Sequence, residues 1–306
     1  MPEPREPLVA ESASEREDDA SYPTGEALTA EEALLVTRAA PTRVIVIAGP
    51  ARSGKTTLVA SLYERFHTGP LAGYLFAGSR TLVGFEKRCH LSRRASGREN
   101  PDTERTSHAA TDVLLNLTVR AEGGGPRLEL LFTDIYGEAF RQAADSTDEA
   151  EQLSVLKRAD HVALLVDGGR LASPTQRQGP FSHADALLAS CLEVGMLGPE
   201  SQIQVLVTKA DKLRGGPRAD ANLAFVAERW AWLEGRYREK FASFAQFEVA
   251  ARPEAPSPLG AAHGLDVIFP LWVSHPRPAA PGRSEPPPRG HGPFDGFGRA
   301  WPVRKD

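Results

Sequence analysis

The sequence is poor in cysteine and has no long hydrophobic run. Its 306 residues include two cysteines, Cys89 and Cys191, which are not spaced as a metal-binding or redox pair. A disulfide framework and a zinc centre are therefore not expected. No apolar stretch approaches the roughly 18 residues that a membrane-spanning helix needs, and the acidic first thirty residues do not resemble a signal peptide. We expect a soluble, cytoplasmic protein without membrane contact.

The sequence also lacks an excess of positive charge. Its 36 lysines and arginines stand against 40 acidic residues, which gives a formal net charge of −4 at pH 7. A strongly basic field of the kind that attracts nucleic acid is missing, so we expect no direct binding to nucleic acid.

Charge and proline divide the chain into three parts. Residues 1–32 hold ten acidic residues against two arginines, and residues 276–306 hold eight prolines. Such segments bury too little apolar surface to offset the entropy of ordering, which predicts disordered tails over 1–40 and 276–306. The remaining residues, 41–275, form the predicted domain.

Strand-like and helix-like segments alternate within this domain. Such alternation predicts an α/β fold of three layers, in which helices cover both faces of a mainly parallel sheet. The sequence "AEGGGP" between two strands predicts an antiparallel hairpin at one edge, and residues 68–111 form a long insertion after the first helix. The expected strands are 43–49, 73–79, 112–120, 127–134, 161–168, 202–211 and 247–252, and the expected helices are 54–66, 80–90, 148–159, 183–197 and 218–244.

A glycine-rich loop follows the first predicted strand. The sequence "GPARSGKT" fits the pattern GxxxxGK[ST] and leads directly into a helix. Glycines let backbone N–H groups converge on phosphate oxygens, and the helix adds its positive end, so the loop predicts a nucleoside triphosphate site in a P-loop NTPase fold. Lys55 would contact the β- and γ-phosphates. The predicted phosphate contacts are Gly49, Pro50, Ala51, Arg52, Ser53, Gly54, Lys55, Thr56 and Thr57.

A second motif, "TKAD" from Thr208 to Asp211, follows the strand "QIQVLV". A carboxylate at the last position can accept two hydrogen bonds from guanine, whereas adenine offers neither donor, so the motif predicts guanine specificity. The stem of Lys209 would lie along the base, and Thr208 would tie this loop to the phosphate loop. Ala250 and Ala251, at the end of the next strand, could offer a backbone N–H to the guanine oxygen, although a plain strand end explains them nearly as well.

The segment "DIYGE" supplies candidates for metal binding and hydrolysis. Asp134 ends a hydrophobic strand, so it would hold Mg²⁺ through water, together with the hydroxyl of Thr56. Gly137 would sense the γ-phosphate through its N–H, which makes Lys55, Gly137 and Glu138 the predicted catalytic residues. A third Mg²⁺ ligand is expected from the loop before the hairpin; Thr106 is preferred, with Thr103, Ser107 and Thr111 as alternatives.

The order phosphate loop, hairpin, DxxG and TKxD resembles P-loop GTPases of the translation-factor and small-GTPase (TRAFAC) class. The resemblance covers about residues 42–273, and the long insertion looks like a bacterial branch of this class, the double-GTPase family. It implies the family roles of Lys55, Thr56, Asp134, Lys209 and Asp211, and an association with bacterial conflict or immunity systems. It does not imply a particular partner.

Glu138 departs from the pattern of small GTPases, in which the residue after DxxG is usually glutamine or histidine. Its charge would lie near the anionic γ-phosphate and oppose the build-up of negative charge in the transition state, so we predict slow hydrolysis. Arg105 or Arg52 could offset this charge, but a solvated surface role fits each arginine better.

The sequence thus predicts a GTP-binding, slowly hydrolysing regulatory switch that acts on a protein partner. The ligands implied are GTP or GDP and Mg²⁺. Two alternatives stay open. One is a P-loop ATPase or kinase in which TKAD is incidental, and the other is a module that binds GTP without hydrolysing it. The aromatic residues Trp230, Trp232, Tyr237 and Phe241 fit core packing better than a base-stacking surface.

Overall fold

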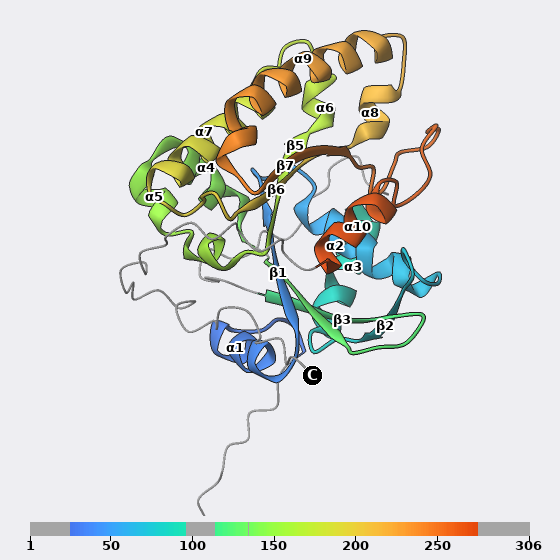
Figure 1. Ribbon diagram of the computed structural model, residues 1–306. Coiled ribbons are helices and arrows are strands. Elements are labelled where there is room, and N and C mark those ends of the chain that lie inside the picture. The colour runs from blue at the N-terminus through green and yellow to red at the C-terminus, as the bar shows by residue number, and fades with distance from the viewer. Residues whose placement is uncertain (1–24, 96–113, 134, 275–306) are drawn as a thin grey trace, which may run out of the picture.

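The computed structural model describes residues 25–95, 114–133 and 135–274 (Figure 1). Its centre is a seven-stranded sheet with the order β2-β3-β4-β1-β5-β6-β7. Strands β4, β1, β5, β6 and β7 are parallel, whereas β3 is antiparallel to both of its neighbours, β2 and β4. The strands are β1 (Thr42–Ala48), β2 (Tyr74–Gly78), β3 (Leu114–Ala121), β4 (Leu128–Thr133), β5 (His161–Asp167), β6 (Gln202–Thr208) and β7 (Ser243–Glu248).

Helices cover both faces of the sheet, which gives the three layers predicted for this fold class. Helices α2, α3 and α10 pack on one face, and α4, α5, α7 and α9 on the other (Figure 1). The helices are α1 (Ala30–Ala39), α2 (Lys55–His67), α3 (Leu82–Ala95), α4 (Gly137–Asp145), α5 (Thr147–Glu151), α6 (Gly168–Leu171), α7 (Gly179–Glu193), α8 (Ala210–Arg214), α9 (Ala219–Tyr237) and α10 (Leu265–Val273). Two short 3₁₀ helices span Ser154–Arg158 and Arg238–Lys240.

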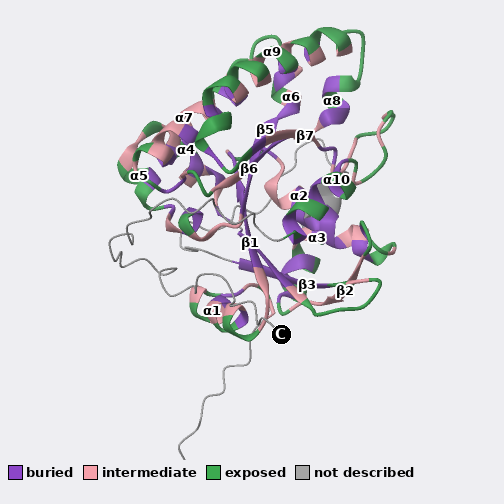
Figure 2. Ribbon diagram, in the orientation of Figure 1, coloured by how far each residue is buried: buried purple, intermediate pink, exposed green. Residues whose placement is uncertain are grey.

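The central strands are buried on both sides, which explains their continuous apolar sequences. All seven residues of β5 are buried, as are the last six of β1, and Figure 2 shows this buried centre between partly exposed helices. A strand that is covered on both faces cannot alternate polar and apolar residues. The parallel part of the predicted sheet is confirmed.

The predicted hairpin is confirmed, but it does not form the edge of the sheet. Strands β3 and β4 pair antiparallel from Leu114 opposite Thr133 to Val119 opposite Leu128. Strand β2, from the insertion 68–111, pairs with β3 and becomes the outer strand. The insertion then continues into α3, which packs on α2 through the stacked rings of Tyr63 and Phe85 (4.9 Å between centroids).

The prediction of a disordered tail over residues 1–40 is wrong for its last part. Residues 30–39 form α1, which begins with a capping box in which Thr29 and Glu32 bond each other's backbone N–H. Ala33 and Val36 are fully buried, and Leu28 pairs with Leu114 at the start of β3. These few apolar residues dock the segment on the sheet despite its acidic composition. Residues 1–24 and 275–306 lie outside the described residues.

Two predicted helices are too long. The segment expected as one helix over 148–159 contains α5 and a separate 3₁₀ helix, with the buried Leu153 between them. The long helix expected over 218–244 ends at Tyr237, and β7 begins at Ser243. Phe241 lies beyond the end of α9 but stacks on Tyr237, so its spacing from that residue mimicked a helical repeat.

One further observation concerns membranes. In the part of the chain that the structure describes, no helix is long and apolar enough to cross a bilayer.

Candidate nucleotide-binding site

The predicted site segments meet at the carboxyl ends of the parallel strands. The phosphate loop follows β1, the TKAD segment follows β6, and residues 249–254 follow β7. Because β4, β1, β5, β6 and β7 are neighbours in this order, their following loops lie along one edge of the sheet. This is where ligands bind in open α/β sheets.

The phosphate loop has the backbone that its glycines allow. Gly49 has φ 151° and Gly54 has φ 103°, and a Cβ added to Gly49 would lie 2.9 Å from the Ser53 hydroxyl oxygen. No side chain caps α2, which begins directly after Gly54, so this helix end can accept an anion. Lys55 Nζ donates to the carbonyl oxygens of Gly49 (2.7 Å) and Pro50 (3.1 Å), which places its ammonium over the loop.

The TKAD segment is bonded directly to the phosphate loop. Thr208 Oγ1 donates to the Ser53 carbonyl oxygen (2.7 Å), and Lys209 Nζ donates to that of Arg52 (2.9 Å). Lys209 has a left-handed backbone (φ 52°) and also forms an ion pair with Asp167 (2.8 Å). These hydrogen bonds join two motifs whose bonded residues are 155 and 157 positions apart in the sequence.

The side chain predicted to read the base, Asp211, is buried. Asp211 is 8% exposed, and its Oδ2 accepts a hydrogen bond from the Glu254 backbone N–H at 3.2 Å. The N–H of Ala250 donates to the His263 carbonyl oxygen (3.1 Å), so it is already used within the protein. Of the two predicted alanines, Ala251 is the better candidate for a backbone contact with a base.

Gly137 lies against the phosphate loop at the start of α4. A Cβ added to it would lie 2.4 Å from the Ala51 backbone nitrogen and 2.7 Å from Lys55 Nζ. The next turn of α4 places the buried Phe140 ring beside Lys55, with 5.8 Å between Nζ and the ring centre. The structure thus brings the predicted catalytic residues Gly137 and Lys55 together.

The neighbour of Glu138 was not predicted. Arg141, one turn further along α4, donates to the Glu138 carboxylate through Nε and Nη2, and this pairing raises the pKa of the arginine. Arg141 also lies 3.6 Å from Asp145. The spacing i, i+3 was the available signal, but it required knowing that residues 137–145 are helical. Arg52, considered earlier for this role, is exposed on the phosphate loop.

The described residues supply one of the predicted magnesium ligands. Thr56 is in the first turn of α2, beside the phosphate loop, where a hydroxyl fits the coordination of a hard cation. Asp134 and Thr106 lie outside the described residues, as do Thr103, Ser107, Thr111 and Arg105. Among the residues that are described, no group of three or more histidine, cysteine or acidic side chains could hold a metal by itself.

The acidic residues at the two ends of β5 have structural roles. Asp167 caps α6 by accepting from the N–H of Gly169 (2.9 Å), and Asp160 accepts from the N–H of Val44 (2.8 Å). Burial raises the pKa of Asp160 and lowers that of His161 to about 4. These contacts give the two aspartates capping and turn roles.

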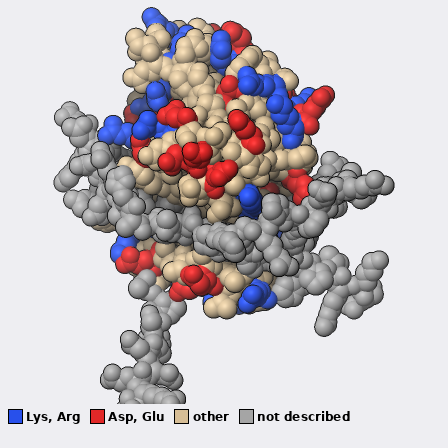
Figure 3. All heavy atoms as spheres, turned by 90° about the vertical axis from the view of Figure 1, so that its left-hand side faces the viewer, with Lys and Arg blue, Asp and Glu red and all other residues tan. Residues whose placement is uncertain are grey.

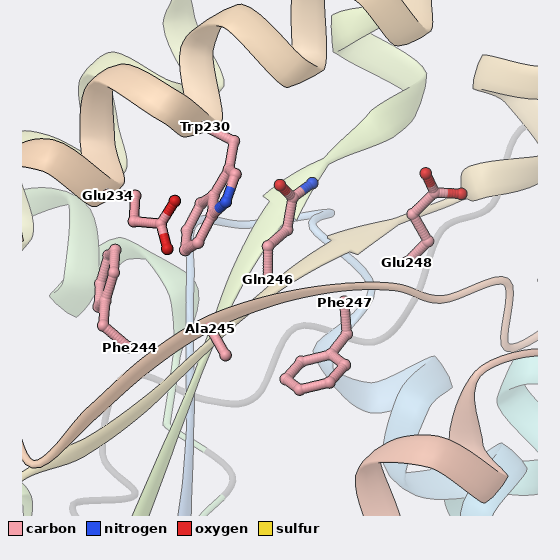
Figure 4. Close-up of a pocket in the computed structure, with 7 residues that line it drawn as sticks. All are labelled: Trp230, Glu234, Phe244, Ala245, Gln246, Phe247 and Glu248. Atoms are coloured by element: carbon pink, nitrogen blue, oxygen red, sulfur yellow. The ribbon is translucent and has the colours of Figure 1, made fainter. Parts of the chain in front are cut away.

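A separate hollow lies beside the outer strand β7, under α9 (Figure 4). Trp230 and Phe244 stack there, with 5.2 Å between ring centres, while Leu233 and Tyr237 are buried. Trp230, Tyr237 and Phe241 therefore serve in packing, as expected, whereas Trp232 is 44% exposed on α9, so the packing prediction is wrong for this residue. None of the predicted nucleotide contacts lines this hollow. Figure 3 shows acidic and basic side chains on the same face of the molecule, without a field of one sign.

A profile of the Double-GTPase 2 family matches residues 43–273, which is more than half of the chain. The chain belongs to the Double-GTPase 2 family. The resemblance inferred from the order of the motifs is thereby confirmed, and the match spans β1, the phosphate loop, the hairpin, the TKAD segment and α10.

Several solved GTPase structures are also similar to this Double-GTPase 2 protein. The GTPase-like domain of S. cerevisiae Ski7 bound to GTP is 12% identical over 78% of this chain and 51% of its own, with a TM-score of 0.44. Era, in complex with MgGDPNP and nucleotides 1506–1542 of 16S ribosomal RNA, is 14% identical over 79% and 60%, with a TM-score of 0.39. SelB from Methanococcus maripaludis is 12% identical over 69% and 30%, with a TM-score of 0.35. The chain thus spans from under a third to under two thirds of these proteins. A search of curated proteins found no match.

Proposed function

We propose that this double-GTPase binds GTP as a regulatory switch and hydrolyses it slowly. One observation carries the proposal: Thr208 and Lys209 bond the carbonyls of the phosphate loop, while Asp211 of the same segment is held buried beside it. These bonds join the segment that carries Asp211 to the phosphate loop, and a single nucleotide would span both.

Asp211 would select guanine. Its carboxylate would accept hydrogen bonds from the ring N–H and the exocyclic amine of guanine, whereas adenine offers neither donor to this buried group. A site built on such hydrogen bonds discriminates by about 10⁴ to 10⁵. This step separates the proposal from an ATPase or kinase.

The phosphates would be bound by the loop and by α2. Lys55 would exchange its bonds to the Gly49 and Pro50 carbonyls for phosphate oxygens. Thr56, with Asp134 and Thr106, would hold Mg²⁺, which neutralises phosphate charge when bound. Gly137 would donate its N–H to the γ-phosphate, so loss of that phosphate would release the start of α4 and change the surface offered to a protein partner. The family resemblance suggests that this partner belongs to a bacterial conflict system.

Hydrolysis would be slow because of the residue beside Gly137. The Glu138 carboxylate is engaged by Arg141, so it is a poorly available acceptor for an attacking water, and its charge opposes that of the transition state. Slow turnover suits a switch whose lifetime a partner controls.

The decisive test is Asp211→Asn, with Asp220→Asn on the exposed start of α9 as the matched control. We expect the first variant to lose at least about 100-fold in its preference for GDP over XDP, because an amide pairs with the xanthine oxygen instead of the guanine amine. Equilibrium titration with a fluorescent nucleotide measures both affinities. If Asp211→Asn keeps the preference of the control, the base assignment is wrong. Release of labelled phosphate in a single turnover separates a slow GTPase from a module that only binds.

A further inference from the structure

An ion pair joins the loop beside Asp211 to the helix that follows the phosphate loop. We use the term base loop for residues 250–254, between β7 and the following turn. Arg252 in this loop donates to the carboxylate of Glu64 on α2. Both side chains are largely buried, with 20% and 26% exposed. Water screens such a pair less than one on the open surface.

Glu64, the acidic residue of this pair, lies on a helix that is anchored in the core. Glu64 lies in the third turn of α2, which begins at Lys55 and is anchored by the buried Leu58, Leu62 and Phe66. The Arg252–Glu64 pair therefore fixes the base loop relative to the same helix that starts at the phosphate loop.

The other end of the base loop fixes the carboxylate that reads the base. The backbone N–H of Glu254 donates to Asp211 Oδ2. The Glu254 side chain also pairs with Lys212, but 73% and 39% of those side chains are exposed, and such pairs contribute little. The backbone bond to Asp211 thus depends on where the loop is held, and Arg252 holds it two residues away.

We propose that Arg252, through its ion pair with Glu64, is a positioning residue that sets guanine selectivity. This inference rests on the proposed function, because it assumes that Asp211 reads the base. When the pair is broken, the base loop relaxes, the Glu254 N–H leaves Asp211, and the carboxylate rotates away from the two donors of guanine. The contacts of Lys55, Thr208 and the phosphate loop are unchanged, so phosphate binding is retained.

The test compares GDP with IDP, which lacks the exocyclic amine, on the full-length chain. Arg252→Gln is expected to weaken GDP binding more than IDP binding, because GDP loses two hydrogen bonds to Asp211 and IDP loses one, so the ratio of the two affinities falls about tenfold. Glu64→Gln breaks the same pair from the helix side and should lower the ratio equally. The control is Arg214→Gln, which breaks the more exposed pair with Glu248 and should leave the ratio unchanged.

The double exchange Glu64→Arg with Arg252→Glu restores the pair with reversed charges and is expected to recover at least half of the lost ratio. A generally weakened fold would lower both affinities together and would not be rescued. The inference is overturned if the wild-type protein prefers guanine but Arg252→Gln and Glu64→Gln both keep the ratio of Arg214→Gln. If the wild-type protein shows no preference for guanine, the proposed function fails first, and this inference fails with it.

Discussion

The close contact between Gly137 and the phosphate loop gives a sharp prediction for Gly137→Ala. The added Cβ would lie 2.4 Å from the Ala51 nitrogen and 2.7 Å from its Cα, whereas ordinary contacts begin near 3.4 Å. Both nearest atoms belong to the backbone, which cannot swing aside as a flexible side chain does. The start of α4 or the phosphate loop must therefore move by about 1 Å, and displacements of that size at a reacting centre cost about 100-fold in rate.

We expect Gly137→Ala to lower the single-turnover rate of GTP hydrolysis by about 100-fold and the free energy of unfolding by about 1–3 kcal/mol. The rate is measured as release of labelled phosphate, and the stability by urea unfolding. Gly123→Ala, in the hairpin turn, is the matched control because its Cβ would have no neighbour within 4 Å. If Gly137→Ala matched this control in both measurements, α4 would not lie against the phosphate loop as described.

Three further substitutions test other parts of the structure. Glu138→Gln removes the charge beside the γ-phosphate and should raise the rate of hydrolysis about tenfold; an unchanged rate in the single-turnover assay would contradict the repulsion argument. Thr208→Val leaves the buried Ser53 carbonyl without its donor and should cost about 1–3 kcal/mol in urea unfolding, and a neutral result would refute a stabilising bridge. Burial lowers the pKa of His161 to about 4, so the unfolded chain takes up the proton first as pH falls. The free energy of unfolding should then drop between about pH 6.5 and pH 4, by up to roughly 3 kcal/mol, and His161→Gln should flatten this slope when unfolding is followed across that range.

The parts of the fold that could be predicted are those encoded in short stretches. The strand, loop and helix around "GPARSGKT" form a local unit, and the buried strands β5 and β6 are apolar runs bounded by turn residues. The meeting of Thr208 with Ser53 was predictable because parallel strands bring their carboxyl ends to one edge.

The remaining features depend on contacts that no local pattern reveals. Arg252 and Glu64 are 188 residues apart, and nothing in either surrounding sequence marks the other as its partner. The pairing of Arg141 with Glu138 needed the knowledge that their segment is helical. Helix α1 was missed because it continues directly from the acidic stretch 1–32, while Ala33 and Val36 dock it against the sheet.

Helix α1 has a practical consequence for anyone who expresses this protein in pieces. The family match begins at residue 43, which invites a fragment cut at the start of β1. Such a fragment keeps every motif, yet it discards Leu28, Ala33 and Val36, which share an apolar core with Val44 and Leu131. The cut would expose an apolar patch on the sheet that α1 normally covers, and we expect such a fragment to aggregate in solution. A fragment that starts before Gly25 retains the natural cover.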